Sequence, residues 1–190
     1  MDDAAVTAAQ ARAREYFRTR CTEVTAQAIR DGVQDACTAL DEFLATVPAP
    51  AAARRAAPGA WSAQEVVDHL IETYRPGLDE LLCVLAGENP PGEPIPAGLQ
   101  SKAPMLRPWP WMLRELRTLH ADVAAALANA PEDVGTARAP IVMVVNVKAP
   151  DGSFTPIHWI EALDWRAYAM VSWRLHPIDH LKQARAAVRG

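Results

Sequence analysis

Apolar side chains recur every three or four residues along most of this chain, the spacing that places them on one face of a helix. The pattern is clearest in residues 33–47, 61–85 and 109–130. Residues 3–30 contain many Ala and Arg residues and neither Pro nor Gly, so they predict a leading helix that packs outside the others. Gly32 is the expected break between this helix and the next, and one bent helix is the alternative.

Local signals predict where individual helices begin. Ser62 is a good N-cap, and Glu65 stands three residues later, as a capping box requires. A Thr-Pro pair at residues 155–156 predicts the start of a fourth helix that runs to about residue 188. Pro177 lies inside that helix and removes a backbone hydrogen bond, so a kink or a restart is expected there.

Residues 141–147 depart from the helical pattern. They are mostly β-branched and bounded by prolines, so they predict a strand, followed by a turn signal at Asp151-Gly152. Because a lone strand has no ladder partner, an extended segment lying across the helices is the alternative. Residues 87–108 are rich in Pro and Gly and predict a long connection, of the kind that covers a site or joins distant ends.

Together these elements predict an all-α fold. It is an antiparallel four-helix bundle with an extra N-terminal helix and a short extended segment near residues 141–147. Residues 1–30 form the N-terminal helical extension, and residues 31–190 form the bundle domain. A chain of 190 residues is long enough to bury a full hydrophobic core as one domain.

Composition and charge narrow the classes of function. The net charge is −4 and the two signs are interspersed, unlike the basic stripe of a nucleic-acid-binding protein. The longest apolar run is far shorter than a membrane span, and the chain starts acidic where a signal peptide would be basic. Cys21, Cys37 and Cys83 are odd in number and lack C-x-x-C spacing. We therefore expect a cytoplasmic protein that binds neither nucleic acid nor membrane.

Histidine supplies the candidate chemistry. His176 and His180 stand four residues apart, which on a helix places both imidazoles on one face. Such a pair can bind one metal ion, but a catalytic site needs a third protein ligand and a structural site a fourth. With five histidines, a chance pair at this spacing is about a one-in-ten event. Two solvated histidines near a helix end are the alternative.

A facing helix offers a further histidine, His69, and metal sites in bundles are built from side chains on facing helices. The two remaining histidines fit less well. His120 lies beside the apolar stripe of its helix, and we interpret it as a core-edge or surface residue. His158 would lie roughly 27 Å from His176 on the predicted fourth helix, too far to share its metal ion.

Two segments read together resemble the DinB/YfiT-like metal-binding family. The sequence PGAWSAQEVVDHL, residues 58–70, resembles the family's second-helix signature, a Trp-Ser pair that opens a helix with a His two turns later. The sequence HPIDHLKQ, residues 176–183, resembles its fourth-helix signature, His-x-x-x-His-x-x-Gln. The order and separation of the two segments also match the family. The resemblance covers about residues 33–188.

This resemblance implies that His69, His176 and His180 are the ligands of a divalent metal ion, which is Zn, Ni or Fe. It also implies a four-helix bundle that is often dimeric, and hence a homodimer. Pro177 lies inside the ligand pair and departs from the family's pattern, because a kink changes the direction of the two imidazoles. A helix that restarts at Pro177 would still hold His180 one turn in.

Other residues are candidates for the surroundings of this site. A ligating His usually needs a hydrogen-bond partner for its other ring nitrogen. The candidates for that role are Asp68, Glu72, Asp179 and Gln183. A solvated face is the alternative for the acids. Trp173 precedes His176 by one turn and could wall a pocket, and Arg166 could hold an anionic substrate in the same cavity. The alternatives are core packing for the tryptophan and a surface salt bridge for the arginine.

The resemblance implies a metal-dependent enzyme that acts on a small-molecule substrate. Either a thiol-dependent S-transferase using a low-molecular-weight thiol or a small-molecule hydrolase fits. Three neutral imidazoles leave the ion open positions for water or substrate. A non-catalytic metal-binding or stress-associated dimeric helical-bundle protein is the alternative, because it needs the same ligands. A helical interaction module with a vestigial site is a third hypothesis.

Overall fold

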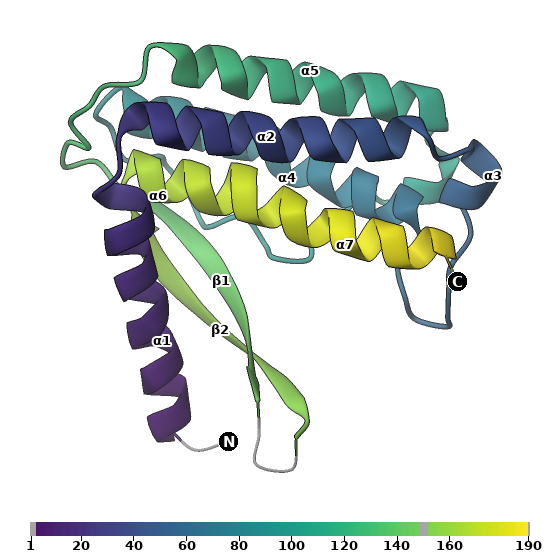
Figure 1. Ribbon diagram of the computed structural model, residues 1–190, viewed down its shortest axis with the longest axis horizontal. Helices are drawn as coiled ribbons and strands as arrows, with labels where there is room; N and C mark the ends of the chain where they lie inside the picture. Colours follow the sequence, from purple (N-terminus) through teal and green to yellow (C-terminus); the bar gives the residue numbers. More distant parts are fainter. Residues whose placement is uncertain (1–2, 149–151, 190) are drawn as a thin grey trace.

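The computed structural model describes residues 3–148 and 152–189 and shows a mostly helical protein with a two-stranded antiparallel hairpin (Figure 1). No helix in these ranges is both long and apolar enough to span a bilayer. The elements are α1 (Asp3–Phe17), a π-helix (Arg18–Thr22), α2 (Ala26–Ala45), α3 (Ala49–Ala52), α4 (Ala63–Leu85), a 3₁₀ turn (Pro104–Leu106), α5 (Trp109–Ala128), β1 (Ala139–Lys148), β2 (Phe154–Leu163), α6 (Trp165–Met170), a second π-helix (Val171–Leu175) and α7 (His176–Arg189).

Helices α2, α4, α5 and α7 lie side by side around a shared core (Figure 1). The Trp109 indole at the start of α5 donates a hydrogen bond to the Val47 carbonyl just past the end of α2 (2.9 Å), so these two helices run in opposite directions. The Gln64 amide at the start of α4 donates to the Pro104 carbonyl just before α5 (3.1 Å). Helices α4 and α5 therefore run in the same direction, because residues 86–108 return along their length. The antiparallel arrangement predicted for the bundle is wrong for this pair.

The predicted capping box at the start of α4 is confirmed. The Ser62 hydroxyl accepts a hydrogen bond from the Glu65 amide (3.2 Å), and the Glu65 carboxylate accepts one from the Ser62 amide (2.8 Å). Arg55 makes an ion pair with the same carboxylate, and this neighbour holds the pKa of Glu65 below its usual value. The charged carboxylate thus fixes the first turn of the helix that carries His69.

The expected break at Gly32 is wrong, because α2 already begins at Ala26. Thr25 caps that start, and its hydroxyl accepts a hydrogen bond from the Ala28 amide (3.2 Å). Gly32 lies inside α2, where a Cβ atom would be 2.8 Å from the Cδ of Arg174. The glycine therefore permits a close approach to the segment before α7. The division into residues 1–30 and 31–190 stays a prediction.

The strand predicted at residues 141–147 is confirmed and extends over the whole of β1. Its partner is β2, paired antiparallel from Ala139 opposite Leu163 to Lys148 opposite Phe154. The backbone groups of β1 therefore have hydrogen-bond partners in β2, which a lone strand would lack. The predicted turn at Asp151-Gly152 begins at Asp151, which lies outside the described residues.

The helix predicted from residue 155 is wrong over its first turns, so the fold is not all-α. Residues 154–163 form β2, in which buried Ile157 and Leu163 face inward and Ile160 is exposed. Over so short a stretch, apolar residues spaced by two fit a strand and those spaced by four fit a helix, so the pattern does not decide between the two. Helix α6 begins only after Asp164, whose carboxylate accepts hydrogen bonds from two backbone amides of its first turn (3.0 Å each).

Helix α1 lies beside the hairpin, and both extend away from the other helices (Figure 1). The Arg14 guanidinium on α1 makes an ion pair with Glu161 on β2 (2.9 Å). The Trp159 indole donates a hydrogen bond to the same carboxylate (2.9 Å). A hairpin of two strands is only marginally stable by itself in water, so the helix packed against it supports it.

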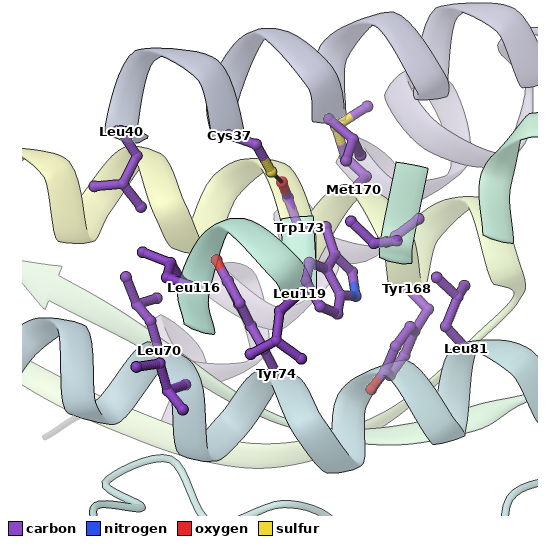
Figure 2. Packing of buried hydrophobic residues seen from close by; sticks show 14 of the residues in the cluster. Cys37, Leu40, Leu70, Tyr74, Leu81, Leu116, Leu119, Tyr168, Met170 and Trp173 are labelled. Atoms are coloured by element: carbon purple, nitrogen blue, oxygen red, sulfur yellow. Dashed lines mark hydrogen bonds between the residues drawn. The ribbon is translucent and has the colours of Figure 1, made fainter. Parts of the chain in front are cut away.

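The core between the long helices includes large aromatic side chains (Figure 2). Tyr74 on α4 and Trp173 before α7 stack with ring centroids 4.1 Å apart, and both are fully buried. The Cys37 thiol on α2 lies 3.9 Å from the Trp173 carbonyl and donates a weak hydrogen bond to it. These contacts fix the segment before α7 against α2 and α4, and that segment leads directly into His176.

Candidate metal centre

His69 is a buried residue on α4, two turns after the Ser62 cap, and is 1% exposed. Its Nδ1 atom lies 2.7 Å from the Leu99 carbonyl, so Nδ1 carries the hydrogen and donates it. The lone pair of the neutral ring is then on Nε2. That Nε2 atom lies 3.0 Å from the Nε2 atom of His176. Tetrahedral Zn–N bonds of about 2 Å would place two such atoms about 3.3 Å apart.

His176 and His180 complete the cluster from α7. The π-helix Val171–Leu175 runs directly into α7 at His176, and the Trp173 carbonyl, four residues before Pro177, accepts a weak hydrogen bond from the Cys37 thiol in place of the missing amide. The kink or restart predicted at Pro177 is therefore not seen as a break; the chain stays helical, and a π-helical stretch precedes the proline. The ring centroids of the pair are 4.4 Å apart, and that of His69 lies 4.7 Å from His180. One possible ligand atom from each of the three histidines lies within 4.8 Å of the other two.

Burial keeps the three imidazoles neutral. It lowers the pKa of His69, and it lowers the pKa of His176 well below its usual value, with the two other histidines adding to the effect there. Burial, together with the nearby His69, lowers the pKa of His180 to about 4. Metal binding requires the deprotonated ring. The three rings are therefore uncharged at neutral pH, and His176, whose Nε2 atom donates to that of His69, would need only to change tautomer to ligate through Nε2.

The outward nitrogens of two of these rings are held by the protein. The Leu99 carbonyl accepts from His69, as described above, and the Gln183 Oε1 atom lies 2.8 Å from Nδ1 of His180. Each partner fixes the tautomer that leaves Nε2 toward the centre of the cluster. Gln183 is the residue that follows the histidine pair in the predicted signature. The sequence analysis did not foresee the backbone carbonyl of Leu99.

The segment of residues 99–101, named here the latch, is hydrogen-bonded to α4. Its Ser101 amide and hydroxyl donate to the buried carboxylate of Asp68 (2.8 Å and 2.7 Å). Its Gln100 amide donates to the Glu65 carbonyl (3.0 Å). Asp68 also makes an ion pair with Arg107 (2.9 Å). The long connection therefore covers the site, and Asp68 positions His69 through the latch rather than by direct contact.

An Asp68→Asn substitution is expected to weaken Zn²⁺ binding about tenfold, because loss of an indirect partner of a metal ligand typically costs that much or more. Asparagine removes the negative charge that pairs with Arg107 and one of the two oxygens that accept from Ser101. Competition titration against a chromophoric chelator measures the change. Glu72→Gln is the matched control on the same helix and should leave the affinity unchanged. Equal losses in the two variants would contradict a role for the latch.

Three predicted neighbours of the site point elsewhere. Glu72 makes ion pairs with Arg75 (3.1 Å) and Arg107 (2.8 Å) and contacts no histidine of the cluster. Asp179 is largely exposed and pairs with Lys182 (2.8 Å). Trp173 is packed in the core against Tyr74 and does not wall a pocket beside the site.

Arg166 was expected to face the metal cavity or to make a surface salt bridge, and it makes a salt bridge, from a buried guanidinium to an exposed carboxylate. It is 6% exposed, and its guanidinium donates to the carbonyls of Thr22 (3.0 Å), Val24 and Glu132. An ion pair with the Glu132 carboxylate adds to these contacts (2.9 Å). Arg166 therefore joins α6 to the segment between α1 and α2, away from the histidines.

The two other histidines lie outside the cluster. His120 is a buried residue on α5 whose Nδ1 atom lies 3.0 Å from the Asp41 carboxylate. His158 is an exposed residue on β2, opposite Val144. The three histidines singled out by the combined pattern are thus the three that meet.

Trp61, just before the Ser62 cap, covers two of the rings. Its ring lies 5.2 Å from that of His69 and stacks nearly parallel on that of His180, at 6.4 Å.

Comparison with known proteins gave no match. No family model, no curated protein and no solved structure matches the chain. Its function must therefore be inferred from the histidine cluster itself.

The stability of the metal-free protein is expected to fall as the pH decreases from 6.5 to 4. The cluster has lowered pKa values in the folded state, so the unfolded chain binds more protons in this window. The pKa of about 4 at His180 alone corresponds to roughly 3 kcal/mol. Urea unfolding at several pH values measures the slope, which should be smaller in a His180→Gln variant. A slope that is the same in both proteins would contradict the burial of a neutral His180.

Proposed function

We propose that this chain is a metal-dependent enzyme in which His69, His176 and His180 bind a divalent ion, Zn, Ni or Fe. The observation that carries the proposal is the convergence of three neutral imidazoles from two helices far apart in sequence. We further propose that the four packed helices are a bundle of the DinB/YfiT-like type. The Trp-Ser helix start and the His-x-x-x-His-x-x-Gln segment support this relationship.

The reaction that fits best is S-transfer from a low-molecular-weight thiol, or hydrolysis, on a small-molecule substrate. A bound ion with three imidazole ligands lowers the pKa of a coordinated thiol or water and polarises a carbonyl. Nitrogen ligands suit Zn, Ni and Fe alike. The nearby carboxylates of Asp68 and Glu72 are already engaged by Ser101 and arginines. The chain's own contribution is therefore to hold the three rings neutral and oriented.

Activity of the metal-loaded chain tests this proposal. The protein is loaded with each metal in turn and assayed for transfer of a small thiol to electrophiles and for ester and amide hydrolysis. We expect turnover with at least one metal, and none after chelation or in the His69→Ala variant. A metal-loaded chain that is inactive in both assays would favour the non-catalytic alternative.

A homodimer, which the enzyme and the non-catalytic metal-binding or stress-associated alternative both allow, is supported by one feature of the hairpin. Its outward face exposes Val144 (45%), Ile160 (61%) and Phe154 (65%). An exposed apolar face of this kind often marks a protein–protein contact. Analytical ultracentrifugation of an Ile160→Lys variant tests for the dimer: the variant should be monomeric if two copies join through this face.

A further inference from the structure

A groove of about 520 Å³ lies where the 3₁₀ turn leads into α5. Its lining combines apolar side chains with two guanidiniums: Leu106, Arg107, Pro108, Pro110, Trp111 and Arg114. This volume falls within the range of small-molecule sites. Leu106 is 83% exposed, more than any other large apolar residue that the structure describes. Its removal from water by a ligand would therefore be favourable.

Both arginines of the groove have hydrogen-bond donors to spare. Arg114 is exposed, and its side chain has no partner within residues 3–148 and 152–189. Arg107 uses a single nitrogen, Nη1, for its ion pairs with Asp68 (2.9 Å) and Glu72 (2.8 Å). Its guanidinium also lies over the Trp111 ring, 5.5 Å from the ring centroid. Arg107 is thereby held in place, and its Nε and Nη2 atoms bind no other group in the described part of the chain.

The charge of the groove is positive. Among the described residues that line it, two are cationic and none is acidic. The neighbouring acids are engaged elsewhere, since Asp68 is fully buried and both Glu72 and Glu115 make ion pairs with Arg75. The charge of Arg114 is therefore paired with none of them. A guanidinium in this state is suited to a carboxylate, which it binds through two parallel hydrogen bonds.

We propose that this groove binds a small organic carboxylate with an apolar body. The carboxylate accepts hydrogen bonds from Arg114, and the apolar body packs against Leu106 and Trp111. A neutral molecule of the same shape lacks the charge-assisted hydrogen bonds, and a short carboxylate such as acetate lacks the apolar contact. The site is separate from the three-histidine cluster, so the proposal does not depend on a bound metal ion.

Titration of the full chain with 3-phenylpropionate, followed by the NMR signals of ¹⁵N-labelled indoles, tests the proposal. We expect the Trp111 signal, identified with a Trp111→Phe variant, to move. The dissociation constant should be at least about tenfold lower than for the neutral 3-phenylpropan-1-ol or for acetate. Arg114→Gln should weaken the binding of 3-phenylpropionate about tenfold, because it removes the charged donor. Arg117→Gln is the matched control, since Arg117 is an exposed arginine on the same helix that does not line the groove.

The titration is repeated on the Zn²⁺-loaded chain and should give the same affinity, because no histidine lines the groove. Binding that requires Zn²⁺ would place the carboxylate on the ion and overturn the groove as its site. Equal affinities for 3-phenylpropionate and the alcohol, or equal losses in Arg114→Gln and Arg117→Gln, would overturn the role of Arg114. Acetate that binds as tightly as 3-phenylpropionate would overturn the apolar contact. A Trp111 signal that does not move would overturn the whole proposal.

Discussion

The His176→Ala variant is expected to bind Zn²⁺ more than 100-fold more weakly than the unsubstituted chain. In the unsubstituted chain the Nε2 atom of His176 lies 3.0 Å from that of His69, so removal of the imidazole leaves two ligands where a catalytic site needs three. Loss of an indirect partner alone typically costs about 10-fold to 100-fold in affinity, and loss of a ligand costs more. Competition titration with a chromophoric chelator at neutral pH measures the difference.

His120→Ala is the matched control for this substitution, because His120 is also a buried histidine on a long helix. Its partner is Asp41 rather than the cluster, so the metal affinity of this variant should stay within about twofold. A similar loss in both variants would indicate general damage to the fold. An unchanged affinity in His176→Ala would remove this residue from the proposed ligand set.

Arg166→Met is expected to lower the free energy of unfolding by about 3 kcal/mol while leaving metal affinity unchanged. The guanidinium donates to the carbonyls of Thr22, Val24 and Glu132, and hydrogen bonds from a charged group contribute about 1.5–3 kcal/mol each. Methionine keeps much of the apolar stem but leaves these buried carbonyls without a donor. Urea unfolding, combined with the Zn²⁺ titration, measures both quantities.

Arg30→Met provides the comparison, because Arg30 is a partly exposed arginine whose main partner is Gln27 on the same helix. This substitution should change stability by less than about 1 kcal/mol. If Arg166→Met instead weakened metal binding without loss of stability, Arg166 would belong to the metal cavity, the first of the two roles that the sequence left open.

Local sequence signals predicted the helix starts that depend on a few neighbouring residues. The Ser62–Glu65 capping box is one example, because both hydrogen bonds lie within four residues. The break near Gly32 was predicted wrongly for the opposite reason. The glycine leaves room for the Arg174 side chain, which is far away in sequence and close only after folding.

Strand β1 of the hairpin was predicted and strand β2 was not. As with Gly32, the deciding contact is with a residue distant in sequence. Residues 141–147 have a strong preference for strand, but residues 155–163 carry apolar side chains at spacings that also fit a helix. Pairing with β1 decides between the two, since each strand supplies the hydrogen-bond partners of the other. The cap that starts the following helix is Asp164, beyond the Thr-Pro pair that suggested an earlier start.

The three histidines could be found from the sequence because their spacing and the helix start before His69 are side-chain signals. The latch could not, since its contact with His69 is the backbone carbonyl of Leu99, which any residue carries. Asp179 illustrates the limit of proximity along the chain. It is adjacent to His180 in sequence, but its carboxylate points to solvent and pairs with Lys182.

The most direct test of the metal centre is elemental analysis of the chain purified without an affinity tag or chelator, then dialysed against Zn²⁺, Ni²⁺ or Fe²⁺. We expect about one metal ion per chain for at least one of these metals, and loss of that ion in a His69→Ala, His180→Ala variant. Absence of bound metal under every condition, with an unchanged unfolding curve in the double variant, would contradict the assignment of His69, His176 and His180 as a metal site.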